Sequence, residues 1–180
     1  MHKAQEPTED EGQELTPEQA QEAAVAEALA RLDLPNEGLE FGLLMLPYAK
    51  ERDWERFYRQ ATKLVNDDKL SRQLEKFAAD EKTHQRELQE AYEEIMGTLD
   101  LPERLEDCLS GCPRTGPVMR AGISAKEVLD LAIELEKAAQ LFYEHQMAQS
   151  HDAEVVEALE YMAVLEEEHY IQLKMMRDDL

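Results

Sequence analysis

Residues 158–173 read ALEYMAVLEEEHYIQL, and this stretch decides the fold. Its apolar residues recur at the spacing of one helix face, which is typical of the inward side of an amphipathic helix. Counted from Glu166, that face carries Leu159, Met162, Ala163, Leu173 and Met176. Glu166 and His169 lie one turn apart on the same face. A buried carboxylate and a buried imidazole each cost roughly several kcal/mol without a partner, and a metal ion is a partner that satisfies both.

The Glu-x-x-His pair occurs a second time, 85 residues earlier, as Glu81 and His84. The segments that precede the two pairs share further positions at the same offset: Glu51 with Glu136, Phe57 with Phe142, and Tyr58 with Tyr143. A single offset at so many distinctive positions indicates an internal duplication. Within the run of glutamates from 166 to 168, only Glu166 keeps this register.

The composition indicates one helical domain. The 180 residues include only 7 glycines and 7 prolines, while Ala, Leu, Glu, Gln and Met are abundant, which favours helix over sheet. The formal net charge of −22 opposes nucleic-acid binding, which needs a basic surface, and equally opposes binding to anionic membranes. We therefore expect neither a nucleic-acid nor a membrane partner.

We expect a cytoplasmic location. The first residues, Met1–Gln13, lack the basic and apolar regions of a signal peptide, and the longest apolar patch, Phe41–Leu46, is too short to cross a bilayer. Cys108 and Cys112 are too few for a disulfide framework, which is consistent with a reducing compartment. They could form a regulatory disulfide or be incidental thiols, and they are too few for a structural zinc or rubredoxin-type iron centre.

We expect the chain to divide into three parts: a disordered acidic tail over 1–15, an N-terminal helix over 16–35, and a helical domain over 36–180. Thr16 offers an N-cap, with Pro17 at the first helical position. Within the domain we expect helices over 36–66, 67–96, 124–149 and 152–177, with a long crossover over about 97–123. Pro47 either kinks the first of these helices or begins it, and we favour a kink.

Two hairpins of long helices joined by a crossover predict an all-α, ferritin-like four-helix bundle. Each hairpin contributes one glutamate from its first helix and one Glu-x-x-His pair from its second. The candidate metal ligands are Glu51, Glu81, His84, Glu136, Glu166 and His169. Two divalent ions close together need bridging carboxylates, and one imidazole per ion leaves positions open for dioxygen or peroxide. Four carboxylates also balance the charge of two divalent ions.

The residues that flank these ligands allow two interpretations. Tyr58 and Tyr143 lie seven residues after Glu51 and Glu136, so each either orients a ligand carboxylate or packs as a core aromatic whose hydroxyl has another partner. For Trp54 we expect packing. For the acidic neighbours of the ligands we expect solvent exposure: Glu55, Asp80, Glu167 and Glu168.

LAIELEKAAQLFYEHQM (131–147) and ALEYMAVLEEEHYIQL (158–173) resemble the second hairpin of the rubrerythrin branch of the ferritin-like superfamily, and residues 50–92 resemble the first. The resemblance implies that the six candidate ligands bind two iron ions, with manganese or a mixed pair as the alternative. It also implies reduction of hydrogen peroxide or oxidation of ferrous iron.

The chain departs from the rubrerythrin pattern in two ways. Rubrerythrins usually carry an extra carboxylate one turn after the third-helix ligand; here Ala139 takes that position and Trp54 its counterpart, which is closer to bacterioferritin. We expect no attached rubredoxin-like domain, so electrons would come from a separate, rubredoxin-like donor. We also expect no fifth helix after the fourth, and therefore no cage-forming storage. We expect a homodimer that reduces hydrogen peroxide or dioxygen, the alternatives being a ferroxidase or iron-storage protein and a non-enzymatic metal-binding bundle.

Overall fold

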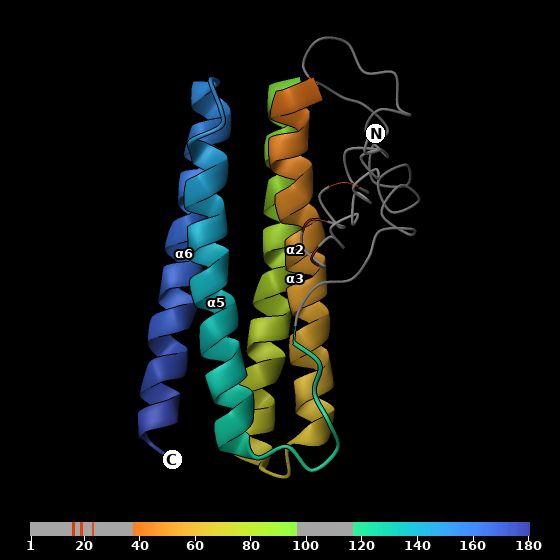
Figure 1. Cartoon of the computed structure of the whole chain (residues 1–180), viewed down its shortest axis with the longest axis vertical. Coiled ribbons are helices and arrows are strands. Elements are labelled where there is room, and N and C mark those ends of the chain that lie inside the picture. The colour runs from red at the N-terminus through yellow and green to blue at the C-terminus, as the bar shows by residue number, and fades with distance from the viewer. Residues whose placement is uncertain (1–15, 17–18, 20–22, 24–37, 97–116) are drawn as a thin grey trace, which may run out of the picture.

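The computed structural model describes residues 38–96 and 117–180, together with Thr16, Gln19 and Ala23. In these ranges it contains four helices and no strand (Figure 1): α2 Gly38–Leu64, α3 Asp68–Met96, α5 Ala125–Met147 and α6 Ala153–Asp178. The predicted all-α fold with four long helices is therefore confirmed, and each helix lies within two residues of the predicted bounds.

Short connections make the helices antiparallel hairpins. Residues 65–67 join α2 to α3, and residues 148–152 join α5 to α6. The two hairpins then lie side by side as a four-helix bundle (Figure 1). Both hairpins carry their apolar residues on the side that faces the other hairpin, and this side forms the core.

Two of the predicted helix starts are fixed by side-chain caps. Ser124 caps α5 in a full capping box, in which its hydroxyl accepts from the Glu127 backbone N–H and the Glu127 carboxylate accepts from the Ser124 backbone. Asp152 caps α6 by accepting from the backbone N–H groups of Glu154 and Val155.

The helix α2 continues through Pro47 and does not begin there. Proline lacks an N–H group and clashes with the preceding turn, so a proline within a helix has to be offset by packing elsewhere. The packing here is extensive, because every residue from 43 to 54 is buried.

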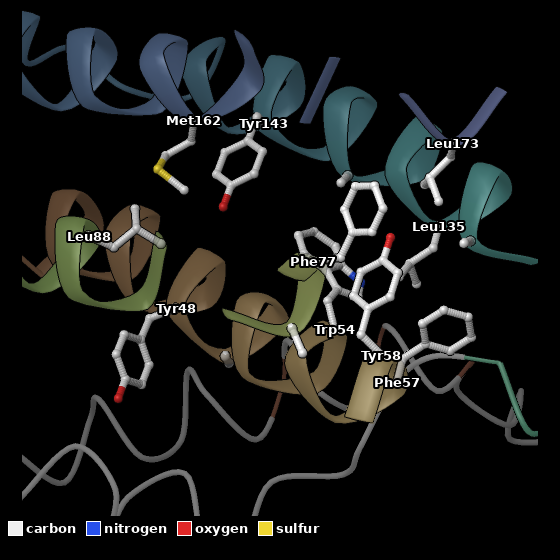
Figure 2. Close-up of a cluster of buried hydrophobic side chains, with 14 of the residues drawn as sticks. Tyr48, Trp54, Phe57, Tyr58, Phe77, Leu88, Leu135, Tyr143, Met162 and Leu173 are labelled. Carbon is white, nitrogen blue, oxygen red and sulfur yellow. The ribbon is translucent and has the colours of Figure 1, made fainter. Parts of the chain in front are cut away.

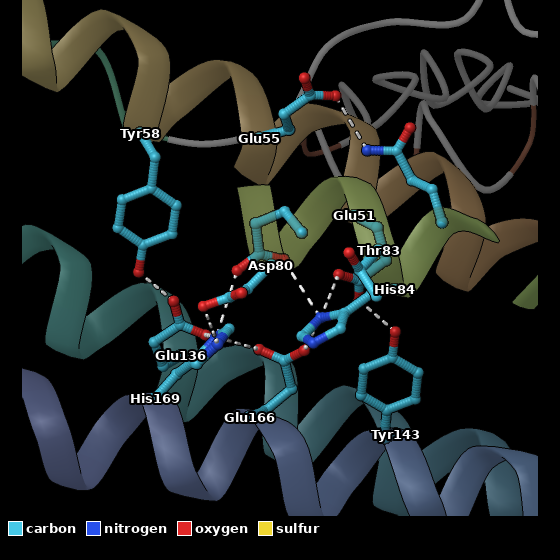
Figure 3. A network of polar contacts seen from close by, with 12 residues as sticks. Glu51, Glu55, Tyr58, Asp80, Thr83, His84, Glu136, Tyr143, Glu166 and His169 are labelled. Atoms are coloured by element: carbon cyan, nitrogen blue, oxygen red, sulfur yellow. Dashed lines mark hydrogen bonds and ion pairs between the residues drawn. The ribbon is translucent and has the colours of Figure 1, made fainter. Parts of the chain in front are cut away.

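The core has two apolar groups spaced along the bundle (Figure 2). One holds an aromatic stack in which the Tyr58 and Phe77 ring centroids lie 5.2 Å apart. The other includes Leu88, Tyr143 and Met162, whose side chains are almost fully buried. The polar side chains of Figure 3 occupy the space between the two groups.

Several predictions from the sequence fall on residues outside the described ranges. They are the acidic tail, most of the N-terminal helix, and the crossover with Cys108 and Cys112. Thr16 and Gln19 are described, and they form the reciprocal bonds of a helix start, as the N-cap prediction requires. Among the described residues, no helix is both long and apolar enough to span a bilayer.

Candidate metal centre

The structure brings the six candidate ligands together in the middle of the bundle (Figure 3). Each helix contributes: α2 supplies Glu51, α3 supplies Glu81 and His84, α5 supplies Glu136, and α6 supplies Glu166 and His169. All six residues are buried, with at most 5% of any of them exposed. In each Glu-x-x-His pair, a spacing of three places both side chains on the same inward face of the helix.

The cluster has an approximate twofold arrangement that reflects the duplication. Glu81 faces both histidines, with Oε2 at 3.6 Å from Nδ1 of His84 and Oε1 at 3.3 Å from Nδ1 of His169. Glu166 does the same, at 3.1 Å from His84 and 3.8 Å from His169. The two imidazole rings stack 5.2 Å apart. Glu81 and Glu166 therefore lie between the two histidines.

The remaining two glutamates each belong to one side of the cluster. Oε2 of Glu51 lies 3.2 Å from Nδ1 of His84, and Oε2 of Glu136 lies 3.8 Å from Nδ1 of His169. Each side of the cluster therefore has one histidine and one glutamate that faces only this histidine, which we call the terminal glutamate. Both sides share Glu81 and Glu166, which face both histidines. This is a suitable set of ligands for one borderline divalent ion per side.

Two tyrosines hold the terminal glutamates across the bundle. The hydroxyl of Tyr58 on α2 donates to Oε1 of Glu136 on α5, and the hydroxyl of Tyr143 on α5 donates to Oε1 of Glu51 on α2. Both tyrosines are fully buried. Of the two interpretations of these residues, the structure supports the one in which they orient carboxylates.

The burial of the cluster raises the pKa of two of its carboxyl groups, Glu51 and Glu166. Burial raises the pKa of Glu51, and the neighbouring Glu81 raises it further. Burial also raises the pKa of Glu166, with added repulsion from Glu51 and Glu81. Glu81 behaves differently: burial pushes its pKa upward, but contact with the imidazoles of His169 and His84 lowers it to about 2.

The neighbouring carboxylates raise the pKa of both histidines. Burial alone would lower the pKa of His169, but contacts with Glu136 and Glu81 raise it to about 10. Contacts with Glu166, Glu51 and Glu81 likewise raise the pKa of His84 despite its burial. The carboxylates around each imidazole therefore favour its protonated form.

Several polar atoms at the centre of the cluster have no hydrogen-bond partner. Atoms that are buried and lack a hydrogen-bond partner include both carboxylate oxygens of Glu81 and of Glu166, Oε2 of Glu136 and Nδ1 of His169. Buried polar atoms normally have partners, so these oxygens and this nitrogen are suited to ion coordination. One ligand atom from each of Glu81, His84, Glu166 and His169 can be chosen so that all four lie within 4.8 Å of one another. The residues present therefore fit a metal centre.

Two acidic residues that we expected to face solvent take part in the surroundings of the cluster. Asp80 is exposed, but its Oδ2 lies 3.7 Å from Nε2 of His169. Glu55 is largely buried, and it accepts hydrogen bonds from the side chains of Gln85 and Arg59. The expectation was wrong for Glu55, whose side chain is only 14% exposed and accepts a hydrogen bond from Gln85 on the neighbouring helix α3. Glu167 and Glu168 are exposed as expected.

The position at which rubrerythrins usually carry an extra carboxylate, and its counterpart in the first half of the chain, are both apolar and buried here. Trp54 on α2 and Ala139 on α5 are at most 5% exposed. Trp54 packs in the apolar core, as expected (Figure 2). Among the described residues, the candidate ligand set therefore remains four glutamates and two histidines.

Residues 43–177, most of the chain, match the sequence profile of one protein family, Rubrerythrin. Neither the search of characterised proteins nor the search of solved structures returned a match. The family match spans all four candidate-ligand helices and includes all six candidate ligands. The chain therefore belongs to the rubrerythrin family.

Proposed function

We propose that Glu51, Glu81, His84, Glu136, Glu166 and His169 hold two iron ions, and that the protein uses this pair to reduce hydrogen peroxide or dioxygen. One observation carries the proposal: four carboxylates and two imidazoles meet in a buried cluster whose central oxygens have no hydrogen-bond partner. Membership in the rubrerythrin family, whose members contain di-iron centres, supports the choice of iron.

The chain's residues would divide the work between holding the ions and orienting the ligands. Glu81 and Glu166 would bridge, because each carboxylate faces both histidines. Tyr58 and Tyr143 would hold the terminal glutamates, since the hydroxyl of each tyrosine donates a hydrogen bond to one of them. Burial raises the pKa of both tyrosines, so they remain hydrogen-bond donors at physiological pH.

The bound ions would supply electrons, one from each ferrous ion, and two electrons are what the reduction of hydrogen peroxide to water requires. The apolar groups on either side of the cluster exclude bulk water from it. An external donor, such as a rubredoxin-like protein, would restore the two electrons after each turnover. We also propose that the protein acts as a homodimer.

The test is to load the metal-free protein anaerobically with ferrous iron and to add one oxidant at a time. We expect hydrogen peroxide to oxidise the iron rapidly, with about one peroxide consumed per two irons. The double variant Glu81→Ala plus Glu166→Ala is the control, because it removes both bridging carboxylates. Equal oxidation in this variant would show that the reaction does not need the cluster. No turnover of the wild type with any reductant would leave a metal-binding bundle without enzymatic activity.

A ferroxidase or iron-handling protein is the second candidate function. The observation that favours it is the symmetric set of six candidate ligands, with Ala139 where rubrerythrins usually have a further carboxylate and Trp54 at the matching position of the first half. The same experiment separates the two. Dioxygen reacting as fast as peroxide, together with the build-up of ferric mineral, would establish the ferroxidase; a clear preference for peroxide would exclude it.

A further inference from the structure

Asp80 lies immediately before Glu81 on α3, outside the six candidate ligands, and its carboxylate faces one of the two histidines (Figure 3). Its Oδ2 is 3.7 Å from Nε2 of His169, the ring nitrogen that does not face the other carboxylates. This is an ion-pair distance, and a hydrogen bond requires a somewhat closer approach. The Asp80 side chain is 55% exposed, so it has room for that approach.

Within the part of the chain that the structure describes, no carboxylate pairs with Nε2 of the second histidine, His84. The 85-residue offset that relates the two halves places Leu165 on α6 at the position of Asp80. Leu165 is apolar and packs against the core. Among the described residues, every ion pair of His84 is made by its Nδ1. The two halves therefore supply the same ligands but different surroundings.

A carboxylate behind a metal-binding histidine has a known physical effect. It accepts the N–H of the nitrogen that does not bind the metal, which fixes the tautomer and raises the basicity of the nitrogen that does. Removing such a partner typically lowers metal affinity about 10- to 100-fold. The negative charge of Asp80 acts in the same direction, because it attracts a cation on its side of the cluster.

We propose that Asp80 makes the two ion positions unequal, so that the ion beside Glu136 and His169 binds more tightly than the ion beside Glu51 and His84. This inference rests on the proposed function, because it assumes that the cluster binds two divalent ions. The two ions then load in order, the position next to Asp80 first. A cluster that loads in this order can also hold two different metals.

Anaerobic calorimetric titration of the metal-free protein with cobalt(II) tests the proposal, because cobalt(II) is stable to oxidation and its visible spectrum reports coordination. The wild type is expected to bind two ions in two resolved steps. Asp80→Asn is expected to weaken the tighter step about tenfold and to leave the other unchanged. Asp80→Glu, which keeps a carboxylate, should restore much of the loss.

Two further variants complete the design. Glu75→Gln removes the same charge from the exposed side of the same helix, and both steps should stay as in the wild type. Leu165→Asp introduces a carboxylate at the position that corresponds to Asp80, and it should tighten the weaker step and bring the two affinities together. The thermal midpoint of each metal-free variant shows whether a change in affinity is only a folding defect.

Three results would overturn the inference. Two equal steps in the wild type would show that the positions do not differ. An effect of Asp80→Asn no larger than that of Glu75→Gln would show that Asp80 does not act through His169. Absence of cobalt binding by the wild type would remove the proposed function itself, and the inference with it.

Discussion

At the scale of single residues, the centre depends on contacts between the two hairpins. Tyr58 lies on the first hairpin and donates to Glu136 on the second, while Tyr143 on the second donates to Glu51 on the first. Each tyrosine therefore orients the glutamate of the other half. A hydroxyl that orients a ligand carboxylate affects metal affinity more than it affects folding.

Replacing either tyrosine by phenylalanine should therefore weaken metal binding. We expect Tyr58→Phe and Tyr143→Phe each to lower the affinity for one cobalt(II) ion about tenfold, measured by anaerobic titration. Tyr161→Phe is the matched control, because Tyr161 is exposed and its loss should change nothing. If both buried variants bound cobalt like the wild type, the tyrosines would be core aromatics only.

The pKa shifts predict how pH acts on the metal-free protein. His169 has a folded pKa of about 10 against an ordinary value of 6.5, so its stabilising contribution is complete below about pH 6.5 and is lost as the pH rises towards 10. Glu51 and Glu166 have raised pKa values, so they too favour the folded state less as the pH rises above 4.5. Glu81 acts in the opposite sense, but only as the pH falls from 4.5 towards 2.

The free energy of unfolding of the metal-free protein should accordingly fall between about pH 6 and about pH 9. Metal binding displaces protons from the same groups, so the stabilisation by added cobalt(II) should grow over this range. Denaturant titrations at several pH values, with EDTA and with cobalt(II), measure the metal-free stability and the stabilisation by the metal. His145→Gln, at an exposed histidine, should keep the slope; a metal-free stability that rises with pH would contradict the prediction.

The six candidate ligands could be predicted from the sequence because a single 85-residue offset relates them, but their surroundings could not. The sequence pattern places Asp80 off the apolar face of its helix, which predicts a surface residue. Only the packing of α3 against α6 shows that it reaches His169. The crossed pairing of the tyrosines also depends on how the hairpins face each other. Glu55 accepts a hydrogen bond from Gln85, a residue on another helix.

At the scale of secondary-structure elements, two caps set where the second hairpin's helices begin. The capping box of Ser124 and Glu127 starts α5, and Asp152 starts α6. Ser124→Ala and Asp152→Ala should each lower the free energy of unfolding by about 1 kcal/mol. Chemical denaturation of the metal-free protein measures this loss. Ser124→Thr retains the oxygen acceptor and should be close to wild type; a full loss there would point to a different cause.

Local patterns also explain which features of the elements could be predicted. Apolar periodicity and capping residues gave bounds within two residues, because these signals act within a turn or two of helix. The continuous burial of α2 from 43 to 54 could not be predicted, since it includes Lys50, Arg52 and Asp53. Their environment explains part of it: Lys50 lies over the ring of Phe142, and Arg52 pairs with Asp53.

At the scale of the whole molecule, the centre lies where the two hairpins meet, so metal should strengthen their association. A ligand at about 100 times its dissociation constant stabilises the folded state by about 2.7 kcal/mol. Two ions should therefore raise the thermal midpoint by about 10–20 °C for a protein of this size. Calorimetric scans with cobalt(II) and with EDTA measure the difference. The double variant Glu81→Ala plus Glu166→Ala should lose most of it.

The most direct test of the central claim is the iron content of protein reconstituted anaerobically with ferrous iron, combined with its Mössbauer spectrum after oxidation. We predict about two irons per chain, coupled magnetically into one diamagnetic pair, because in the proposed arrangement Glu81 and Glu166 would hold the two ions close together. The double variant should retain little iron. Iron at no more than the variant's level, or two irons without magnetic coupling, would contradict the account.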